Sequence, residues 1–465
     1  MSTTEATTPA ELVTAHKGRW IDHWDPEDPE FWAKTGKRVA ARNLFFSIFA
    51  EHIGFSIWVM WSVLVLFMGP EYGLSPADKF LLVALPNLVG SLLRIPYTFA
   101  VAVFGGRNWT IFSAGMLLIP SIAAAIVLQP GVSFTTLLVV ATLAGVGGGN
   151  FASSMTNINT YYPERLKGVA LGLNAGGGNI GVAVVQLVGL LIIGLAGTSA
   201  PRLLLGIYIP LVVVAVAGAA LFMNNLSSVR NDTGAAKDAL RERQLWIMSF
   251  LYIGTFGSFI GYSFAFGLVL QNQFHRTPLQ AAAVTFIGPL LGSLIRPVGG
   301  WLSDRINGSI VTFWNFLAMA GASVLIIVAA GVKSLPMFTI GFIALFVLTG
   351  IGNGSTYKMI PSIFRAKANI AIAEGEDRAA AMARARRITG ATIGIVSAVG
   401  ALGGFFINLA FRQSFQATGS GVVAFYSFLA FYAACAWVTY VVYVRRAEAV
   451  GASAANPRRL ALEGV

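Results

Sequence analysis

Long apolar stretches separated by short polar turns run from about residue 43 to residue 444. A helix that crosses a lipid bilayer needs about 20 mostly apolar residues, because each residue adds about 1.5 Å across a hydrocarbon core about 30 Å thick. Residues 108–163 contain no charged residue and no histidine, and Pro130 with Gly131 divides them into two spans. The pattern predicts twelve membrane-spanning helices, at 43–69, 79–104, 110–128, 134–157, 167–196, 203–224, 245–271, 281–302, 309–331, 336–360, 388–411 and 421–444.

The composition agrees with an all-α membrane protein. Hydrophobic residues make up 56% of the 465 residues and charged residues only 11%, against about 25% charged in an ordinary soluble domain. One cysteine and four histidines offer no disulfide framework and no spacing typical of a metal site. The predicted spans contain no carboxylate pair and no nucleophile–base arrangement, which disfavours an enzyme. We therefore expect no cofactor, no bound metal and no catalytic residue.

Lysine and arginine are distributed unevenly between the two sides of the predicted bundle. Both terminal segments and the connections on their side hold 24 of these residues, and the other side holds 5. Because cytoplasmic loops carry the excess of positive charge, both termini are expected in the cytoplasm. The net charge of +12 is then a topology signal, and nucleic acid is not an expected partner. We expect a multi-pass protein of the cytoplasmic membrane of a prokaryote that works as a monomer.

The chain divides into two similar halves. We expect a cytoplasmic N-terminal segment at 1–42 without a signal peptide, and six-helix halves at 43–224 and 245–444. A polar cytoplasmic linker joins them at 225–244, and a cytoplasmic tail follows at 445–465.

An internal repeat relates the two halves to each other. Gly-Ser-Leu-Leu-Arg at 90–94 recurs as Gly-Ser-Leu-Ile-Arg at 292–296, and Gly-Val-Gly at 145–147 recurs as Gly-Ile-Gly at 350–352. Parallel repeats that hold a substrate between them near the middle of the membrane are typical of secondary transporters. A channel would show a charged ring or filter instead.

Four charged side chains fall within the predicted spans: Arg94, Arg296, Lys358 and Glu51. Each cation costs about 2.5–3.5 kcal/mol near the centre of a membrane helix, so the three are expected to face a polar cavity. A snorkelling side chain is the alternative, and it carries most weight for Lys358, near the end of its helix. A guanidinium gives two parallel hydrogen bonds to an oxyanion. We therefore predict a small anion held between Arg94 and Arg296.

Two predicted helices are rich in glycine, at residues 168–181 and 394–406. The first contains three consecutive glycines but lacks the Gly-Lys-Ser/Thr ending of a phosphate loop, so we reject nucleotide binding. Close helix packing explains most of these glycines at least as well as ligand contact. Asn174 and Asn179 place amides in this helix, either as anion donors or as interhelical hydrogen-bond partners. Tyr252 and Phe256 share one helix face, where core packing is the simpler interpretation.

The chain also resembles a known family over nearly its whole length, the nitrate/nitrite porter family of the major facilitator superfamily. The two glycine-rich helices resemble the paired nitrate signatures of that family. Further similar segments are 25–32 (Asp-Pro-Glu-Asp-Pro-Glu-Phe-Trp), 93–97 (Leu-Arg-Ile-Pro-Tyr), 104–107 (Phe-Gly-Gly-Arg), 150–155 (Asn-Phe-Ala-Ser-Ser-Met), 245–249 (Leu-Trp-Ile-Met-Ser), 255–261 (Thr-Phe-Gly-Ser-Phe-Ile-Gly) and 300–305 (Gly-Trp-Leu-Ser-Asp-Arg).

The resemblance implies the major facilitator fold and roles for particular residues. Arg94 and Arg296 would clamp nitrate or nitrite, Asn179 and Ser397 would contribute from the signature helices, and Ser355 would add a polar contact. Tyr252 and Phe256 would line the site. The segment 300–305 resembles the superfamily's latch between cytoplasmic helix ends, to which we assign Asp304, Arg305 and Arg107.

The coupling mode stays open between two mechanisms. An empty carrier with two unpaired buried arginines is costly to reorient, which favours obligatory exchange of nitrate for nitrite. Glu51 and His52, however, are a protonatable pair at membrane depth, as proton-coupled uptake needs, and Lys358 adds a further cation. A structural hydrogen bond or ion pair is the competing interpretation for Glu51 and His52. An exchanger of organic anions or phosphate is the alternative function.

Overall fold

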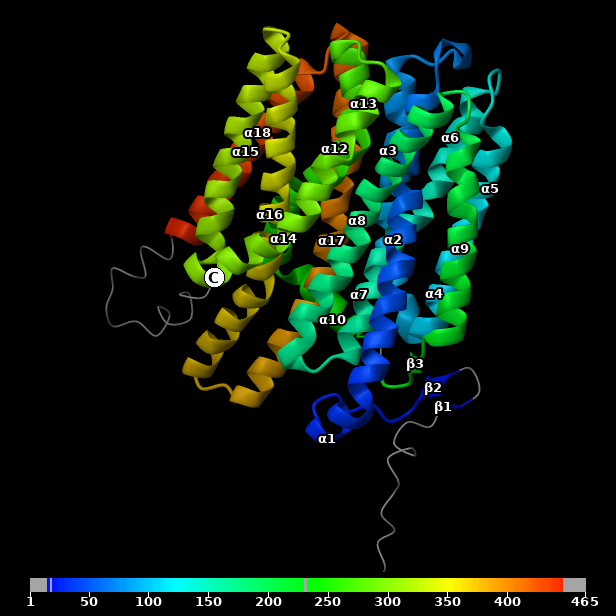
Figure 1. Ribbon diagram of the computed structural model, residues 1–465. Coiled ribbons are helices and arrows are strands. Elements are labelled where there is room, and N and C mark those ends of the chain that lie inside the picture. The colour runs from blue at the N-terminus through cyan, green and yellow to red at the C-terminus, as the bar shows by residue number, and fades with distance from the viewer. Residues whose placement is uncertain (1–14, 17–18, 230–231, 446–465) are drawn as a thin grey trace, which may run out of the picture.

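The computed structural model describes residues 15–16, 19–229 and 232–445 as a nearly all-helical bundle (Figure 1). Twelve segments of these residues are long and apolar enough to cross a membrane, which confirms the predicted number. The first six consist of α2 (Lys37–Phe67); α3 (Pro76–Phe104); α4 (Gly106–Met116) with α5 (Leu118–Val127); α6 (Phe134–Leu143) with η3 (Ala144–Gly149) and α7 (Asn150–Tyr161); α8 (Glu164–Ala196); and α9 (Arg202–Phe222).

The second six spans begin after the central connection. They consist of α11 (Arg243–Tyr252) with η4 (Ile253–Gly257) and α12 (Ser258–Phe274); α13 (Pro278–Thr285) with α14 (Ile287–Ile306); α15 (Gly308–Gly331); α16 (Leu335–Ala373); α17 (Arg378–Thr418); and α18 (Val422–Thr439) with η5 (Tyr440–Val444). Three helices are longer than the expected spans: α2 begins before residue 43, α16 continues past residue 360 and α17 begins before residue 388. Hydropathy marks only the part of a helix that lies in lipid, and these extensions carry charged residues.

The strands and the short helices outside the spans mark the two ends of the bundle. The terminal end carries β1 (Ala15–His16), β2 (Trp20–Ile21), β3 (Asn225–Leu226), α1 (Pro29–Phe31) with η1 (Trp32–Gly36), and α10 (Thr233–Arg241). The opposite end, called the far end below, carries η2 (Pro70–Tyr72) and the connection between α12 and α13. Strand β2 pairs antiparallel with β1 and parallel with β3. The N-terminal segment thus packs against the start of the central connection.

The repeated glycines allow the helices that carry the two arginines to pack closely against their neighbours. A Cβ at Gly145 would lie 2.9 Å from the backbone carbonyl oxygen of Pro86 on α3. In the other half, a Cβ at Gly350 would overlap the backbone carbonyl of Gly292 on α14. Such close approach is available only to glycine, since any side chain would push the helices apart. In each half, a glycine of the repeat thus packs closely against the backbone of the helix that carries the arginine.

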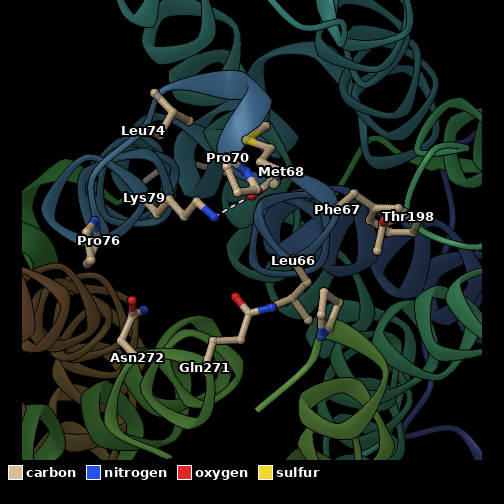
Figure 2. Close-up of a pocket in the computed structure, with 12 residues that line it drawn as sticks. Leu66, Phe67, Met68, Pro70, Leu74, Pro76, Lys79, Thr198, Gln271 and Asn272 are labelled. Carbon is tan, nitrogen blue, oxygen red and sulfur yellow. Dashed lines mark hydrogen bonds between the residues drawn. The ribbon is translucent and has the colours of Figure 1, made fainter. Parts of the chain in front are cut away.

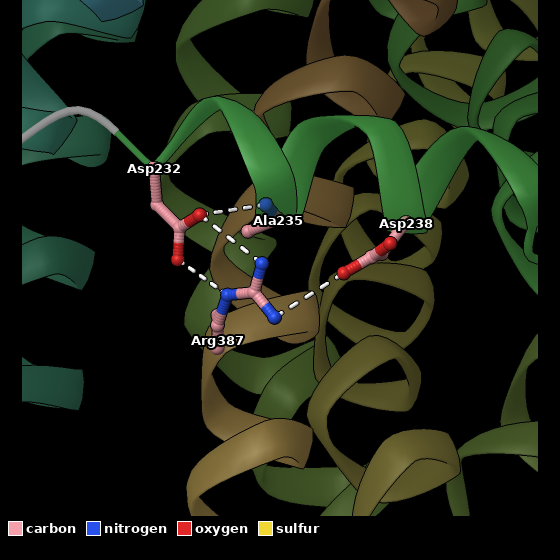
Figure 3. Close-up of polar contacts among 4 residues, drawn as sticks. All are labelled: Asp232, Ala235, Asp238 and Arg387. Carbon is pink, nitrogen blue, oxygen red and sulfur yellow. Dashed lines mark hydrogen bonds and ion pairs between the residues drawn. The ribbon is translucent and has the colours of Figure 1, made fainter.

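The central connection between the two halves contains a helix, α10, that is held by hydrogen bonds and ion pairs. Its helix α10 begins at an N-cap formed by Asp232, whose Oδ1 accepts the backbone N–H of Ala235 at 2.7 Å. Arg387 of α17 donates to both carboxylate oxygens of Asp232, at 2.5 and 3.2 Å, and lies 3.2 Å from Asp238 (Figure 3). These exposed ion pairs are individually weak, but together they fasten α10 to the C-terminal half.

The two halves make contact with each other at the far end. The ring of Phe80 on α3 stacks on Phe411 and Phe415 of α17, at centroid distances of 5.6 and 5.3 Å. The side chain of Gln186 on α8 donates to the backbone carbonyl of Ser263 on α12 at 2.8 Å. These buried contacts close the bundle between the centre and the far end.

Candidate anion-binding site

Arg94 lies on α3 at the interface between the halves. Its side chain is completely buried, with a relative exposure of 0%. Nη1 donates to the backbone carbonyl of Ser397 on α17 at 3.2 Å. Nε and Nη2 have no hydrogen-bond partner among the described residues. No carboxylate of the described residues forms a salt bridge with it.

Aromatic rings surround the guanidinium of Arg94. Its Cζ lies 4.7 Å from the ring centroid of Phe151, 4.9 Å from Phe256, 5.5 Å from Trp58 and 6.0 Å from Phe55. Ring faces attract a cation by about 0.5–2 kcal/mol each. This cage makes the buried charge tolerable and leaves the hydrogen-bonding capacity of Nε and Nη2 unused.

Arg296 occupies the corresponding position on α14. Its Nη2 donates to the hydroxyl of Tyr252 at 3.3 Å, and its Cζ lies 5.5 Å from the ring centroid of Tyr357. Nη1 is buried without a hydrogen-bond partner among the described residues. The ring of Tyr252 stacks on Phe256 at 5.4 Å and 10°. One aromatic stack therefore contacts both guanidiniums, and each guanidinium has an unpaired N–H group.

A local irregularity in the helix positions this stack. Tyr252 ends α11, and Phe256 lies in the π-helical turn η4; such turns are frequent at functional sites. Glycines of α17 allow it to approach the turn: a Cβ at Gly400 would lie 3.1 Å from Cγ of Tyr252, and one at Gly403 would lie 2.8 Å from the Cα of Gly257. These glycines of the second signature helix therefore serve helix packing, and the packing in turn orients the two rings.

Glu51 and Asn174 form a polar network inside the N-terminal half. The amide of Asn174 on α8 donates to Glu51 Oε2 at 2.9 Å and to Ser154 Oγ at 2.6 Å. Ser154 in turn contacts Ser47 at 2.9 Å. Oε1 of Glu51 is buried without a hydrogen-bond partner among the described residues. Of the two interpretations considered for Asn174, the structure thus contains the interhelical hydrogen bond.

The other polar candidates differ in their surroundings. Asn179 is buried, and its Oδ1 has no hydrogen-bond partner among the described residues. Ser397 meets Arg94 through its backbone carbonyl, while its hydroxyl donates to Gly394 within α17 at 2.9 Å. The Ser355 hydroxyl pairs with Thr312 of α15 at 2.8 Å and therefore points away from the arginines.

His52 lies apart from the arginines. Its Nδ1 is 3.1 Å from the backbone carbonyl of Gly177, and its side chain lines a lateral cavity of about 290 Å³. The other residues of that cavity are almost all apolar, among them Tyr208 and Phe45. His52 and Glu51 are adjacent in sequence, but their side chains have different partners.

Lys358 is exposed and paired, which fits the snorkelling alternative left open for it better than a buried, unbalanced cation. Its Nζ forms an ion pair with Asp304 at 2.9 Å, and the two side chains are 48% and 57% exposed. Its partner Asp304 lies in the last turn of α14 and supplies the acid that the sequence pattern did not connect with Lys358. Among the other latch candidates, Arg305 stacks on Trp301 at 4.3 Å. Arg107 donates to the carbonyl of Ala220 at the end of α9, at 2.7 and 3.1 Å.

Most of the aromatic cage around the two arginines could not be predicted from the sequence. Trp58 and Phe55 come from α2, Phe151 from α7 and Tyr357 from α16. Each is a hydrophobic residue within a hydrophobic span, so no local pattern distinguishes it from a lipid-facing ring. Tyr357 offered one signal, because it lies between Ser355 and Lys358, which the sequence had already indicated.

Comparisons with known proteins give a consistent result. Residues 44–373 match the model of the Major Facilitator Superfamily. The chain is 38% identical over 448 residues to "Nitrate/nitrite transporter NarU" of Salmonella typhimurium, covering 92% of this chain and 96% of that protein. It is 34% identical over 464 residues to "Probable nitrate/nitrite antiporter NarK2" of Thermus thermophilus, covering 94% and 99%.

More distant similarities extend this result. "Nitrite extrusion protein" of Bacillus subtilis is 30% identical over 377 residues, covering 80% of this chain and 87% of that protein. The crystal structure of a D-xylose-proton symporter matches with a TM-score of 0.65 at 14% identity, over 86% of this chain and 96% of that one. That structural likeness concerns the fold alone.

Proposed function

The chain belongs to the nitrate/nitrite transporter family of the major facilitator superfamily, a family of transporters rather than enzymes, and we propose that it carries nitrate and nitrite across the cytoplasmic membrane of a prokaryote. The anion binds between Arg94 and Arg296. The termini face the cytoplasm, in keeping with the excess of lysine and arginine on their side.

One observation supports this proposal above all others. Two guanidiniums, one from each half, contact the same aromatic stack, carry unpaired N–H groups and form no salt bridge with a described carboxylate. Buried polar groups are nearly always hydrogen-bonded in stable proteins, so unpaired donors indicate a missing acceptor. A small planar oxyanion supplies acceptors to both forks at once, and its charge offsets the cost of burying the cations.

Exchange of nitrate for nitrite is the transport mode that this geometry favours. Without an anion, the buried Arg94 and the partly buried Arg296 would have to move to the other orientation unpaired, which is energetically costly. A bound anion on each half-cycle removes that cost. Proton coupling is the second candidate, because the unpaired Oε1 of Glu51 is a buried group that could carry a proton. We treat it as the alternative because Oε2 already has a partner in Asn174.

The packing at the far end supports alternating access. The aromatic contacts of Phe80 and the hydrogen bond of Gln186 close the bundle between the site and the far end. On α8, Gly172 and Gly176 have no atoms within contact distance of where a Cβ would lie. We infer that this is the inward-facing state of a cycle whose other state opens at the far end.

Transport in proteoliposomes tests the proposal. Vesicles loaded with nitrite should accumulate external nitrate without an applied proton gradient, whereas empty vesicles should not. Arg94→Lys and Arg296→Lys keep the charge but lose the two-pronged geometry, and each should reduce exchange about 100-fold or more. Arg386→Lys, an exposed substitution on α17, is the matched control and should exchange normally. Near-normal exchange by either clamp variant would refute the clamp.

A further inference from the structure

A cavity of about 410 Å³ lies at the far end of the bundle, between the two halves (Figure 2). One side is formed by the end of α2, the following connection and the start of α3, and the other by the end of α12 and the start of α13. Its lining includes Met68, Gly69, Lys79, Gln271 and Asn272. The cavity is separated from Arg94 by the far-end contacts of Phe80.

Lys79 is the one charged side chain in the lining of this cavity. Its Nζ donates to the backbone carbonyl of Met68, and Figure 2 shows the amine pointing toward the middle of the cavity. An ammonium has three N–H donors, so the single hydrogen bond leaves donors for a ligand. Across the cavity the side-chain amide of Gln271 has no hydrogen-bond partner among the described residues. A cationic donor therefore faces an unused amide.

Neighbouring acids do not form salt bridges with Lys79. Oε1 of Glu71, an exposed residue at the rim, accepts the backbone N–H of Gly69 at 3.2 Å. Oδ2 of Asp78 accepts the backbone N–H and the hydroxyl of Ser75, at 3.0 and 2.7 Å, in a cap that starts α3. The positive charge of Lys79 thus has no ion-pair partner among the described residues.

The same helix leads from this cavity toward the central site. Lys79, Asn87 and Arg94 are separated by eight and seven residues, close to two helical turns each, so they share one side of α3. Asn87 is fully buried between the halves, beside Gly404 of α17, and neither atom of its amide has a hydrogen-bond partner among the described residues. The three side chains span about 22 Å along the helix.

We infer that the far-end cavity is a second anion site, at which Lys79 and Gln271 hold a small inorganic oxyanion before it reaches the central arginines. Asn87 supplies an amide donor between the two sites when the far end opens. This inference rests on the proposed function, since the same anions would occupy both sites. Lysine is a mobile point charge without the fixed fork of arginine, which suits brief capture and release. A cation in a partly enclosed cavity also raises the local anion concentration.

Transport by intact cells tests the inference, because there the far end alone faces the added nitrate under the proposed orientation. Lys79→Gln should raise the KM for external nitrate about threefold to tenfold, with a smaller change in maximal rate. Increasing ionic strength should raise the KM of the unmodified protein more than that of the variant. Lys79→Arg should keep the low KM. Lys333→Gln removes an exposed lysine that does not line the cavity and should leave the KM unchanged.

Binding to the purified protein separates this site from the central one. The dissociation constant of nitrate, measured in detergent, should stay within about twofold for Lys79→Gln and rise at least tenfold for Arg94→Lys. A KM for Lys79→Gln equal to that of Lys333→Gln would overturn the inference. If Lys79→Gln is poorly produced, Gln271→Leu provides the same test and should also raise the KM. Normal transport by Arg94→Lys would instead refute the central clamp. The KM of Lys79→Gln would still decide whether the far-end cavity captures the anion.

Discussion

Arg94 of the N-terminal half donates a hydrogen bond to the backbone carbonyl of Ser397 in the C-terminal half, at 3.2 Å. The guanidinium that faces the proposed anion is therefore also attached to the opposite half. When the halves move, this hydrogen bond must change, and an oxyanion on the two unpaired donors can compensate for the loss. The contact links occupancy of the site to the relative position of the halves.

Replacing Tyr252 by Phe tests the aromatic stack without removing a ring. The hydroxyl that accepts from Arg296 is lost, while the stacking on Phe256 is kept. The lost hydrogen bond joins two protein groups, so it acts on the anion only by releasing the guanidinium of Arg296. Hydrogen bonds to charged groups contribute about 1.5–3 kcal/mol, and we expect a part of this to appear as a roughly threefold to tenfold fall in nitrate affinity. Binding to the purified protein, followed by calorimetry, measures this change. Tyr426→Phe alters an exposed tyrosine and should bind normally; equal affinities in the two variants would contradict the role of Tyr252.

Gly400→Ala should disturb the site through packing alone. The added methyl group would press on the ring of Tyr252, 3.1 Å from its Cγ, and overpacking of this kind costs about 1–3 kcal/mol. We expect weaker nitrate binding and a lower melting temperature. Gly390→Ala on the same helix meets no atom within 4 Å, so it should bind nitrate normally and melt at the same or a higher temperature.

Closure at the far end should depend on the space between Gly404 and Asn87. A Cβ at Gly404 would overlap the amide of Asn87 and lie 2.9 Å from its Cγ. Gly404→Ala should therefore hold the far end open and reduce exchange, measured as nitrate uptake into nitrite-loaded vesicles. Adding Asn87→Ala makes room for the methyl group and should restore part of the rate. Two effects that simply add would show that the residues do not interact.

Glu51→Gln distinguishes exchange from proton coupling. Glutamine keeps an oxygen that can accept from Asn174, so the polar network and the fold should survive. Under the exchange mechanism, uptake into nitrite-loaded vesicles should stay within about twofold of normal. Loss of uptake driven by a proton gradient, with exchange between the two sides retained, would instead identify Glu51 as the proton carrier.

The attachment of α10 to α17 should depend on pH. Hydrogen bonds from Arg387 and from the backbone N–H of Ala235 hold the pKa of Asp232 below its usual range. Because the pKa is depressed in the folded protein, the stabilisation is complete at neutral pH and is lost as the pH falls through that lowered pKa. Asp232→Asn at pH 7 should have the same effect. Hydrogen exchange of α10 should speed up in the variant, while α13 at the far end, the internal reference, should not change.

The sequence by itself determined the membrane helices and indicated the two arginines on which the proposed site depends. The free energy of transferring a helix into lipid is large and depends on the residues of that helix alone, so hydropathy predicts the twelve spans. A cation deep in such a stretch is costly, and its repetition at Arg94 and Arg296 indicated a shared site before any contact was known. The sequence also showed the two glycine-rich helices. It did not show whether their glycines serve helix packing or contact the anion.

Only the tertiary structure decided which groups meet. The sequence could not show that Phe151 and Trp58 surround Arg94, that Asn174 bonds to Glu51, or that Asp304 neutralises Lys358. Each of these pairs joins different helices, and their meeting depends on where the helices cross and how they are rotated. Hydropathy measures the transfer of one helix into lipid and is insensitive to its neighbours. The physical reason for the difference is that the hydrophobicity of each residue can be read from the sequence alone. Which side chains come into contact depends on how the helices pack together.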